Sequence, residues 1–148
     1  MNEPQLQLPA ARGLSLNNIA LAVESLDEMV TWYVTVLGFE AIERGRLDAV
    51  GADYATLSGA GFRLELVSLP GAPRHPADHT KPPGHPATLG WQAIVLRSEN
   101  LGEAMAVLRT HDVGIVWAES QLSTTLISTV IRDPEGNFIN IFGVPESA

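Results

Sequence analysis

The feature that most constrains this chain is an internal repeat. Residues 16–39 and 89–113 each begin with a strand-like alternation of apolar residues and then pass into an amphipathic helix. Aligned from Leu16 and Leu89, the two segments differ by a two-residue insertion in the second copy. A chain that repeats one supersecondary unit is expected to fold as two similar modules, each with a strand that leads into a helix packed back on it.

The helix boundaries can be read in both copies. Ser25 with Glu28, and Asn100 with Glu103, have the spacing of capping boxes, and Gly38 is expected to end the first helix. The apolar positions of the first copy are Ile19, Leu21 and Val23 at strand spacing, then Leu26, Met29, Val30, Tyr33 and Leu37 at helical spacing.

Three shorter strand-like runs follow each helix, so each module has the order β-α-β-β-β. The runs cover 40–46, 49–57, 62–68, 113–118, 124–132 and 138–142, with turn residues between them. This order predicts an α+β fold built from two tandem βαβββ modules.

The chain divides into few segments. We expect a flexible tail over 1–13 and a single domain over 14–146, which consists of module one (15–68), a linker rich in proline and histidine (69–87) and module two (88–143). The linker histidines His75, His79 and His85 have no helical continuity, so we interpret them as solvated residues of a loop or lid rather than as a metal cluster.

Composition excludes several classes of protein. The absence of cysteine rules out disulfides, thiolate metal sites and a cysteine nucleophile. A formal net charge of −8 opposes binding to nucleic acids and to anionic membranes. No apolar run approaches the roughly 20 residues that span a bilayer, and the first residues lack the pattern of a secretory signal. We therefore expect a cytoplasmic protein without a nucleic-acid or membrane partner.

Several motifs resemble one known family, the vicinal-oxygen-chelate superfamily of glyoxalases, bleomycin-resistance proteins and extradiol dioxygenases. The resemblance covers residues 15 to 143 and rests on Asn18-Ile-Ala-Leu-Ala-Val, Trp32-Tyr33, Val36-Leu37-Gly38-Phe39, Leu64-Glu65-Leu66-Val67 and Asp133-Pro134-Glu135-Gly136-Asn137. It implies curved mixed sheets around a central cavity, with the helices outside. Many members of the family are homodimers, so the resemblance also implies a homodimer here.

Catalytic members of the family hold a divalent metal with side chains from the first and last strands of each module. Carried over to this sequence, these positions fall on Asn18, Glu65, Trp91 and Asn140, or on Gln92 in place of Trp91 if the register shifts by one residue. Only Glu65 is a good ligand, and a divalent ion needs several carboxylate or imidazole donors. We therefore expect no metal cofactor.

Glu65 remains the leading candidate for a catalytic residue. Partial burial in a cavity would raise the pKa of its carboxyl group and suit it to act as an acid or base. The alternative is a carboxylate that pairs with Arg63 on the same strand face or with solvent.

Aromatic residues provide a second candidate feature. Trp91, Phe138, Phe142 and Tyr54 are expected either to form a wall that stacks a flat ligand or to fill the space of a lost metal site.

Three functions follow from these alternatives. The first is a binding protein that sequesters or senses a small molecule, with Asn18, Arg63, Gln92 and Asn140 as further ligand contacts; this is what the bleomycin-resistance branch implies. The second is a lyase, isomerase or dioxygenase, metal-dependent through unrecognised ligands or metal-independent through Glu65. The third is a structural role in which Trp91 fills the cavity.

Overall fold

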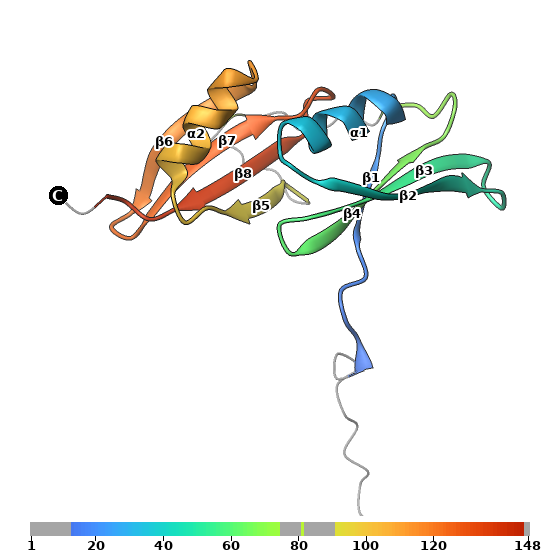
Figure 1. Cartoon of the computed structure of the whole chain (residues 1–148), viewed down its shortest axis with the longest axis horizontal. Helices are drawn as coiled ribbons and strands as arrows, with labels where there is room; N and C mark the ends of the chain where they lie inside the picture. The colour runs from blue at the N-terminus through green and yellow to red at the C-terminus, as the bar shows by residue number, and fades with distance from the viewer. Residues whose placement is uncertain (1–12, 75–80, 82–90, 147–148) are drawn as a thin grey trace, which may run out of the picture.

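The computed structural model describes residues 13–74, 81 and 91–146 (Figure 1). Module one contains β1 (Ile19–Ala22), α1 (Leu26–Thr35), β2 (Glu40–Leu47), β3 (Ala52–Gly59) and β4 (Phe62–Ser68). Module two contains β5 (Ile94–Arg97), α2 (Leu101–Thr110), β6 (Gly114–Ser123), β7 (Leu126–Arg132) and β8 (Phe138–Gly143). The predicted tail and the three linker histidines lie outside the described residues, apart from Gly13.

Each module forms a four-stranded mixed sheet, and the two sheets have the same topology. The strand order is β1-β4-β3-β2 in the first sheet, here called sheet A, and β5-β8-β7-β6 in the second, here called sheet B. The first strand of each module runs parallel to the last, and the remaining pairs are antiparallel. The predicted α+β fold of two tandem βαβββ modules is confirmed.

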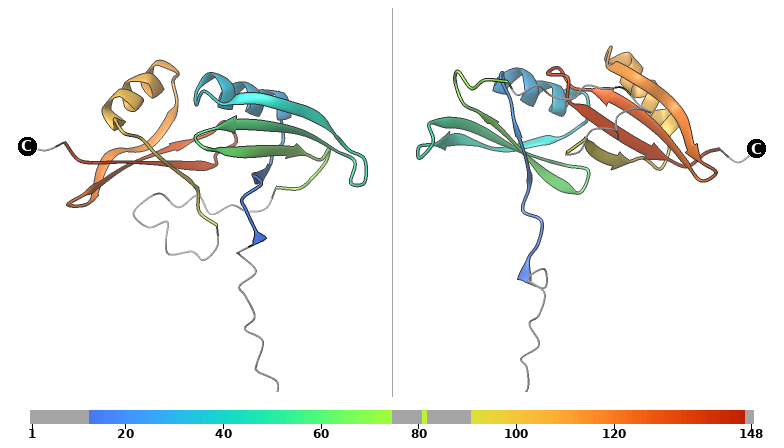
Figure 2. Two further views of the ribbon diagram at one scale, coloured as in Figure 1. Left: turned by 60° about the horizontal axis from the view of Figure 1, so that its bottom comes forward. Right: turned by 180° about the vertical axis from the view of Figure 1, so that it is seen from behind.

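The helices lie on the same side of the molecule, each over its own sheet (Figure 1). Two further views show sheets that are curved but do not close on each other (Figure 2). Each sheet therefore has a face covered by its helix and an opposite face, here called the open face. No helix in residues 13–74, 81 and 91–146 is long and apolar enough to cross a membrane.

The core lies between the helices and the sheets. In module one the buried residues include Met29 and Tyr33 of α1 and Leu57, Leu64 and Leu66 of the sheet. In module two they are Leu101, Met105 and Leu108 of α2 and Ile131, Ile139 and Ile141 of the sheet. These residues belong to one cluster drawn from both modules, and alternate strand positions leave the other side chains on the open faces.

The two predicted helix caps have different outcomes. Asn100 caps α2 as expected, because its side-chain oxygen accepts the backbone N–H of Glu103 at 3.0 Å. The capping box at Ser25 is wrong, because the Ser25 side chain makes no capping hydrogen bond. A carboxylate from module two, that of Glu135, instead accepts the backbone N–H of Ser25 at 3.0 Å. The acceptor lies far along the chain, so a local pattern does not reveal it.

Candidate functional site

The open face of sheet A carries a row of polar side chains. Thr56 on β3 pairs with Glu65 on β4 and with Glu43 on β2, so these three residues lie in one line across the sheet. Glu65 is half-buried. Arg63 and Tyr54 share this face by strand alternation. Among the described residues no ion pair joins Arg63 to Glu65.

Asn18 lies immediately before β1 at the edge of the same face. It lies two residues before Ala20, which pairs with Glu65, so strand alternation puts it on the same side as Ala20. The Asn18 side-chain oxygen accepts a hydrogen bond from the amide of Asn17 at 2.5 Å. The structure therefore brings three of the predicted site residues, Arg63, Glu65 and Tyr54, onto one sheet face, with Asn18 at its margin.

Tyr54 is held against Glu43 on this face. The phenol donates to the Glu43 carboxylate at 2.7 Å, and this hydrogen bond raises the pKa of Tyr54 above its ordinary value. The ring lies over Gly45, where an added Cβ would come within 3.0 Å of it. A side chain at position 45 would therefore push the ring aside, so Gly45 and Glu43 together position the phenol.

Glu43 reaches the open face because β2 contains a β-bulge. Ala41 pairs with Leu57 on the helix-covered side, and Glu43, two residues later, pairs with Thr56 on the open side. Without the irregularity between them, Ala41 and Glu43 would share a face. Strand alternation alone places Glu43 on the wrong side, and this is why the sequence did not identify it as a site residue.

The open face of sheet B is aromatic and closely packed. Phe138, Asn140 and Phe142 alternate along β8 on this face, and each is half-buried. On the neighbouring strand, Val130 is 3% exposed and Ser128 is 0% exposed, although both face away from α2. The Ser128 hydroxyl donates to the side-chain oxygen of Asn140 at 2.5 Å. Three more of the predicted site residues thus share one face.

Trp117 joins this face through a bulge in β6. Ile115 pairs with Ile131 on the helix-covered side, whereas Trp117 pairs with Val130 on the open side, because the register shifts between the two pairs. Strict alternation would place Trp117 on the same face as Ile115, so the sequence pattern alone gives no sign that it belongs to the site. The bulge adds an indole to the face that carries the two phenylalanines of β8, with β7 between them.

Two predicted residues of the second module lie outside its sheet. Trp91 and Gln92 precede β5, and Trp91 is 102% exposed, so this indole does not fill a space between the sheets. Within β5, Val95 pairs with Asn140 and lies on the open face, but this pairing begins at Ile94 and does not extend to Trp91 or Gln92.

The residues at the four positions that the family resemblance assigns to a metal do not suit a divalent ion. Glu65 is their one carboxylate, and the oxygen of Asn140 already accepts a hydrogen bond from Ser128. The indole of Trp91 offers no lone pair to a metal. No group of three or more metal-binding side chains occurs in the described part of the chain. The set therefore lacks the charge and donor number that a divalent cation requires.

The turn between β7 and β8 holds the two modules together. The carboxylate of Glu135 accepts the backbone N–H groups of Glu24 and Ser25 at 2.8 and 3.0 Å. The phenol of Tyr33 on α1 donates to the buried carboxylate of Asp133 at 2.9 Å. Burial and the neighbouring Asp133 raise the pKa of Tyr33 far above its ordinary value. One turn therefore fixes how the two open faces lie relative to each other.

The raised pKa of Tyr33 predicts a loss of stability in alkali. Below pH 10 the phenol is neutral in both states, whereas above it the unfolded phenol ionises and the folded one does not. The free energy of unfolding should therefore fall above pH 10, and it should fall less in Tyr33→Phe, which lacks this phenol. Urea denaturation of both proteins between neutral pH and alkali measures the difference. Parallel declines would show that Tyr33 is not the group responsible.

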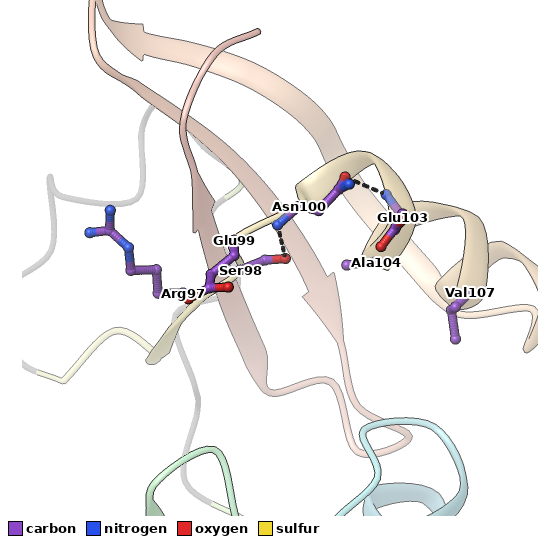
Figure 3. A pocket seen from close by; sticks show the side chains of 7 residues that line it. All are labelled: Arg97, Ser98, Glu99, Asn100, Glu103, Ala104 and Val107. Atoms are coloured by element: carbon purple, nitrogen blue, oxygen red, sulfur yellow. Dashed lines mark hydrogen bonds between the residues drawn. The ribbon is translucent and has the colours of Figure 1, made fainter.

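A shallow hollow lies beside the start of α2 (Figure 3). It is lined by Arg97 to Asn100, Glu103, Ala104 and Val107. Its polar groups form hydrogen bonds that stabilise the start of α2. The Ser98 hydroxyl accepts the backbone N–H of Asn100, and the Asn100 side-chain oxygen accepts the backbone N–H of Glu103. None of the site residues predicted from the sequence lines it, so the open faces remain the candidate site.

Solved structures of similar fold come from several organisms. The glyoxalase family protein from Bacillus cereus is 22% identical with a TM-score of 0.68, and the alignment covers 98% of this chain and 100% of that one. The glyoxalase I of Leishmania major is 20% identical with a TM-score of 0.66, covering 88% and 86% of the two chains. TioX from Micromonospora sp. ML1 is 20% identical with a TM-score of 0.64, covering 88% and 99%.

No curated protein matches the sequence significantly. The model of one family does match, over residues 15–141, a range that runs from before β1 into β8 and includes the turn between β7 and β8. The shared fold and this match lead to one conclusion: the chain belongs to the Glyoxalase/Bleomycin resistance protein/Dioxygenase superfamily.

Proposed function

We propose that this protein binds a small, partly aromatic molecule on the open faces of its sheets and sequesters or senses it without chemical turnover. The observation that carries the proposal is the aromatic face of sheet B, where Trp117, Phe138 and Phe142 stand over a buried floor. Flat aromatic side chains that keep part of their surface accessible offer stacking contacts to a planar ligand.

A catalytic metal is not part of the proposal. The family's metal positions hold a single carboxylate here, and the oxygen of Asn140 is engaged by Ser128. We also propose that the protein acts in the cytoplasm as a homodimer. In support, the outer edges of β1 and β5 have no strand partner among the described residues, so backbone groups remain there for pairing between copies.

Naphthalene derivatives titrated against the protein test the proposal, with calorimetry and intrinsic fluorescence as readouts. Phe142→Ala is expected to weaken binding by about tenfold, since one aromatic contact contributes roughly 0.5–1.5 kcal/mol beyond its buried area. Phe62→Ala is the matched control, because it removes a ring from the helix-covered side of sheet A. Equal losses in the two variants would contradict the site.

Chemical analysis of the recovered ligand separates binding from catalysis. We expect the ligand to be unchanged after incubation with the wild-type protein. Product formation that disappears in Glu65→Gln would instead establish an enzyme in which Glu65 acts as acid or base. The half-buried position of Glu65 beside Thr56 is the observation that favours this alternative.

A further inference from the structure

The open face of sheet B combines its aromatic rings with positive charge. Arg132 on β7 pairs with Phe138 on β8, and its guanidinium carbon lies 5.3 Å from the centre of the Phe138 ring. At the other end of the face, Arg97 on β5 pairs with Phe142. The strands of sheet B place no carboxylate on this face.

The Arg132 guanidinium has an unsatisfied donor. Its Nε is buried and has no hydrogen-bond partner, and Arg132 forms no ion pair within residues 13–74, 81 and 91–146. The terminal nitrogens of the guanidinium are not among the buried atoms, so an anion that accepted from them would compensate a positive charge that has no partner in the described residues.

The nearest acid in the sequence, Asp133, forms no ion pair with Arg132. The buried carboxylate of Asp133 accepts from the phenol of Tyr33, from the backbone N–H groups of Glu135 and Asn137, and from the Asn137 amide. These four hydrogen bonds occupy it within the turn. The positive charge on the open face is therefore left for another partner.

A second donor lies close by. Because the oxygen of Asn140 accepts from Ser128, its amide nitrogen is the group left to donate toward the open face. Asn140 lies diagonally across from Arg132, since its direct partner is Val130, and diagonal neighbours in antiparallel strands are roughly 7–8 Å apart. The two oxygens of a carboxylate accept from separate donors, so an aromatic carboxylate matches the combination of donors and rings on this face.

We infer that the ligand of this face is an aromatic carboxylate, with its ring stacked among Trp117, Phe138 and Phe142 and its carboxylate bound by Arg132. The inference rests on the proposed function and names the chemical class of the ligand. The net charge of −8 does not oppose it, because salt screens charges that lie more than about 8 Å away at physiological ionic strength, whereas the local charge is positive.

A pair of isosteric probes tests the inference by calorimetry: 2-naphthoate, which is anionic, and 2-naphthamide, which is neutral. We expect the wild-type protein to bind 2-naphthoate about tenfold more tightly, as one charge-assisted hydrogen bond predicts. Arg132→Gln should remove this preference and leave the affinity for 2-naphthamide within about twofold, whereas Arg132→Lys should retain part of it.

Arg109→Gln is the matched control, because it makes the same change of net charge at an exposed position of α2. It should leave both affinities unchanged. Equal binding of the two probes, or a preference that survives in Arg132→Gln, would overturn the inference and leave the proposed function standing. Failure of both probes to bind at millimolar concentration would overturn both the inference and the proposed function. Thermal unfolding of each variant verifies that it is folded.

Discussion

Asp133→Ala is expected to lower the free energy of unfolding by about 3–5 kcal/mol, the largest effect of any single substitution at the junction of the modules. The Asp133 carboxylate is 4% exposed and accepts four hydrogen bonds, one of them from Tyr33 in the other module. Its removal leaves one buried donor, the Tyr33 phenol, and three part-buried donors without this acceptor, which costs more than the bonds contribute when formed.

Urea denaturation at neutral pH measures this loss. Asp48→Ala is the control, because the Asp48 side chain is 93% exposed and its ion pair with Arg46 spans 3.7 Å. The control should change stability by less than about 0.5 kcal/mol. A comparable small change in Asp133→Ala would show that the turn does not hold the modules together.

Phe39→Ala is also expected to lower the free energy of unfolding by about 3–5 kcal/mol, because it leaves a cavity in the core. Phe39 is 4% exposed, and its ring makes edge contacts with Tyr33 and Phe62, with centroids 5.9 and 5.6 Å apart. The ring also lies directly against Gly59. Truncation would leave a cavity that the surrounding strands close only in part.

A double-mutant cycle with Gly59→Ala tests this packing. An added Cβ at Gly59 would come within 2.8 Å of the Phe39 ring, so Gly59→Ala alone should cost about 1–3 kcal/mol. In the Phe39→Ala background the same change should cost much less, because the clash is gone and the methyl group fills part of the cavity. Additive losses by chemical denaturation would contradict the contact.

Some positions of the candidate site could be predicted from the sequence. Regular alternation in β4 and β8 correctly separates Glu65 from the buried Leu64, and Asn140 from the buried Ile139. Both strands pair without bulges, so the period of two holds along their full length. The faces of these residues therefore followed from local pattern.

Other positions could not be predicted, and the physical reason is the same in both modules. Glu43 and Trp117 lie beyond bulges in the equivalent strands β2 and β6, and each bulge moves the following side chain to the opposite face. In β6 the irregular segment includes Glu119, with φ at +46°, and its backbone N–H is satisfied by the hydroxyl of Thr129 on β7. A distant partner thus decides where the strand bends.

The sequence by itself determined the duplicated βαβββ order, the family and the side on which regularly alternating residues lie, because periodicity and turn chemistry are local properties. Only the tertiary structure decided that Glu135 caps the start of the first module's helix, that Tyr33 donates to Asp133, and that Arg132 has an unsatisfied donor beside aromatic rings. Those features depend on contacts between residues that are far apart in the sequence, and local sequence patterns do not predict such contacts.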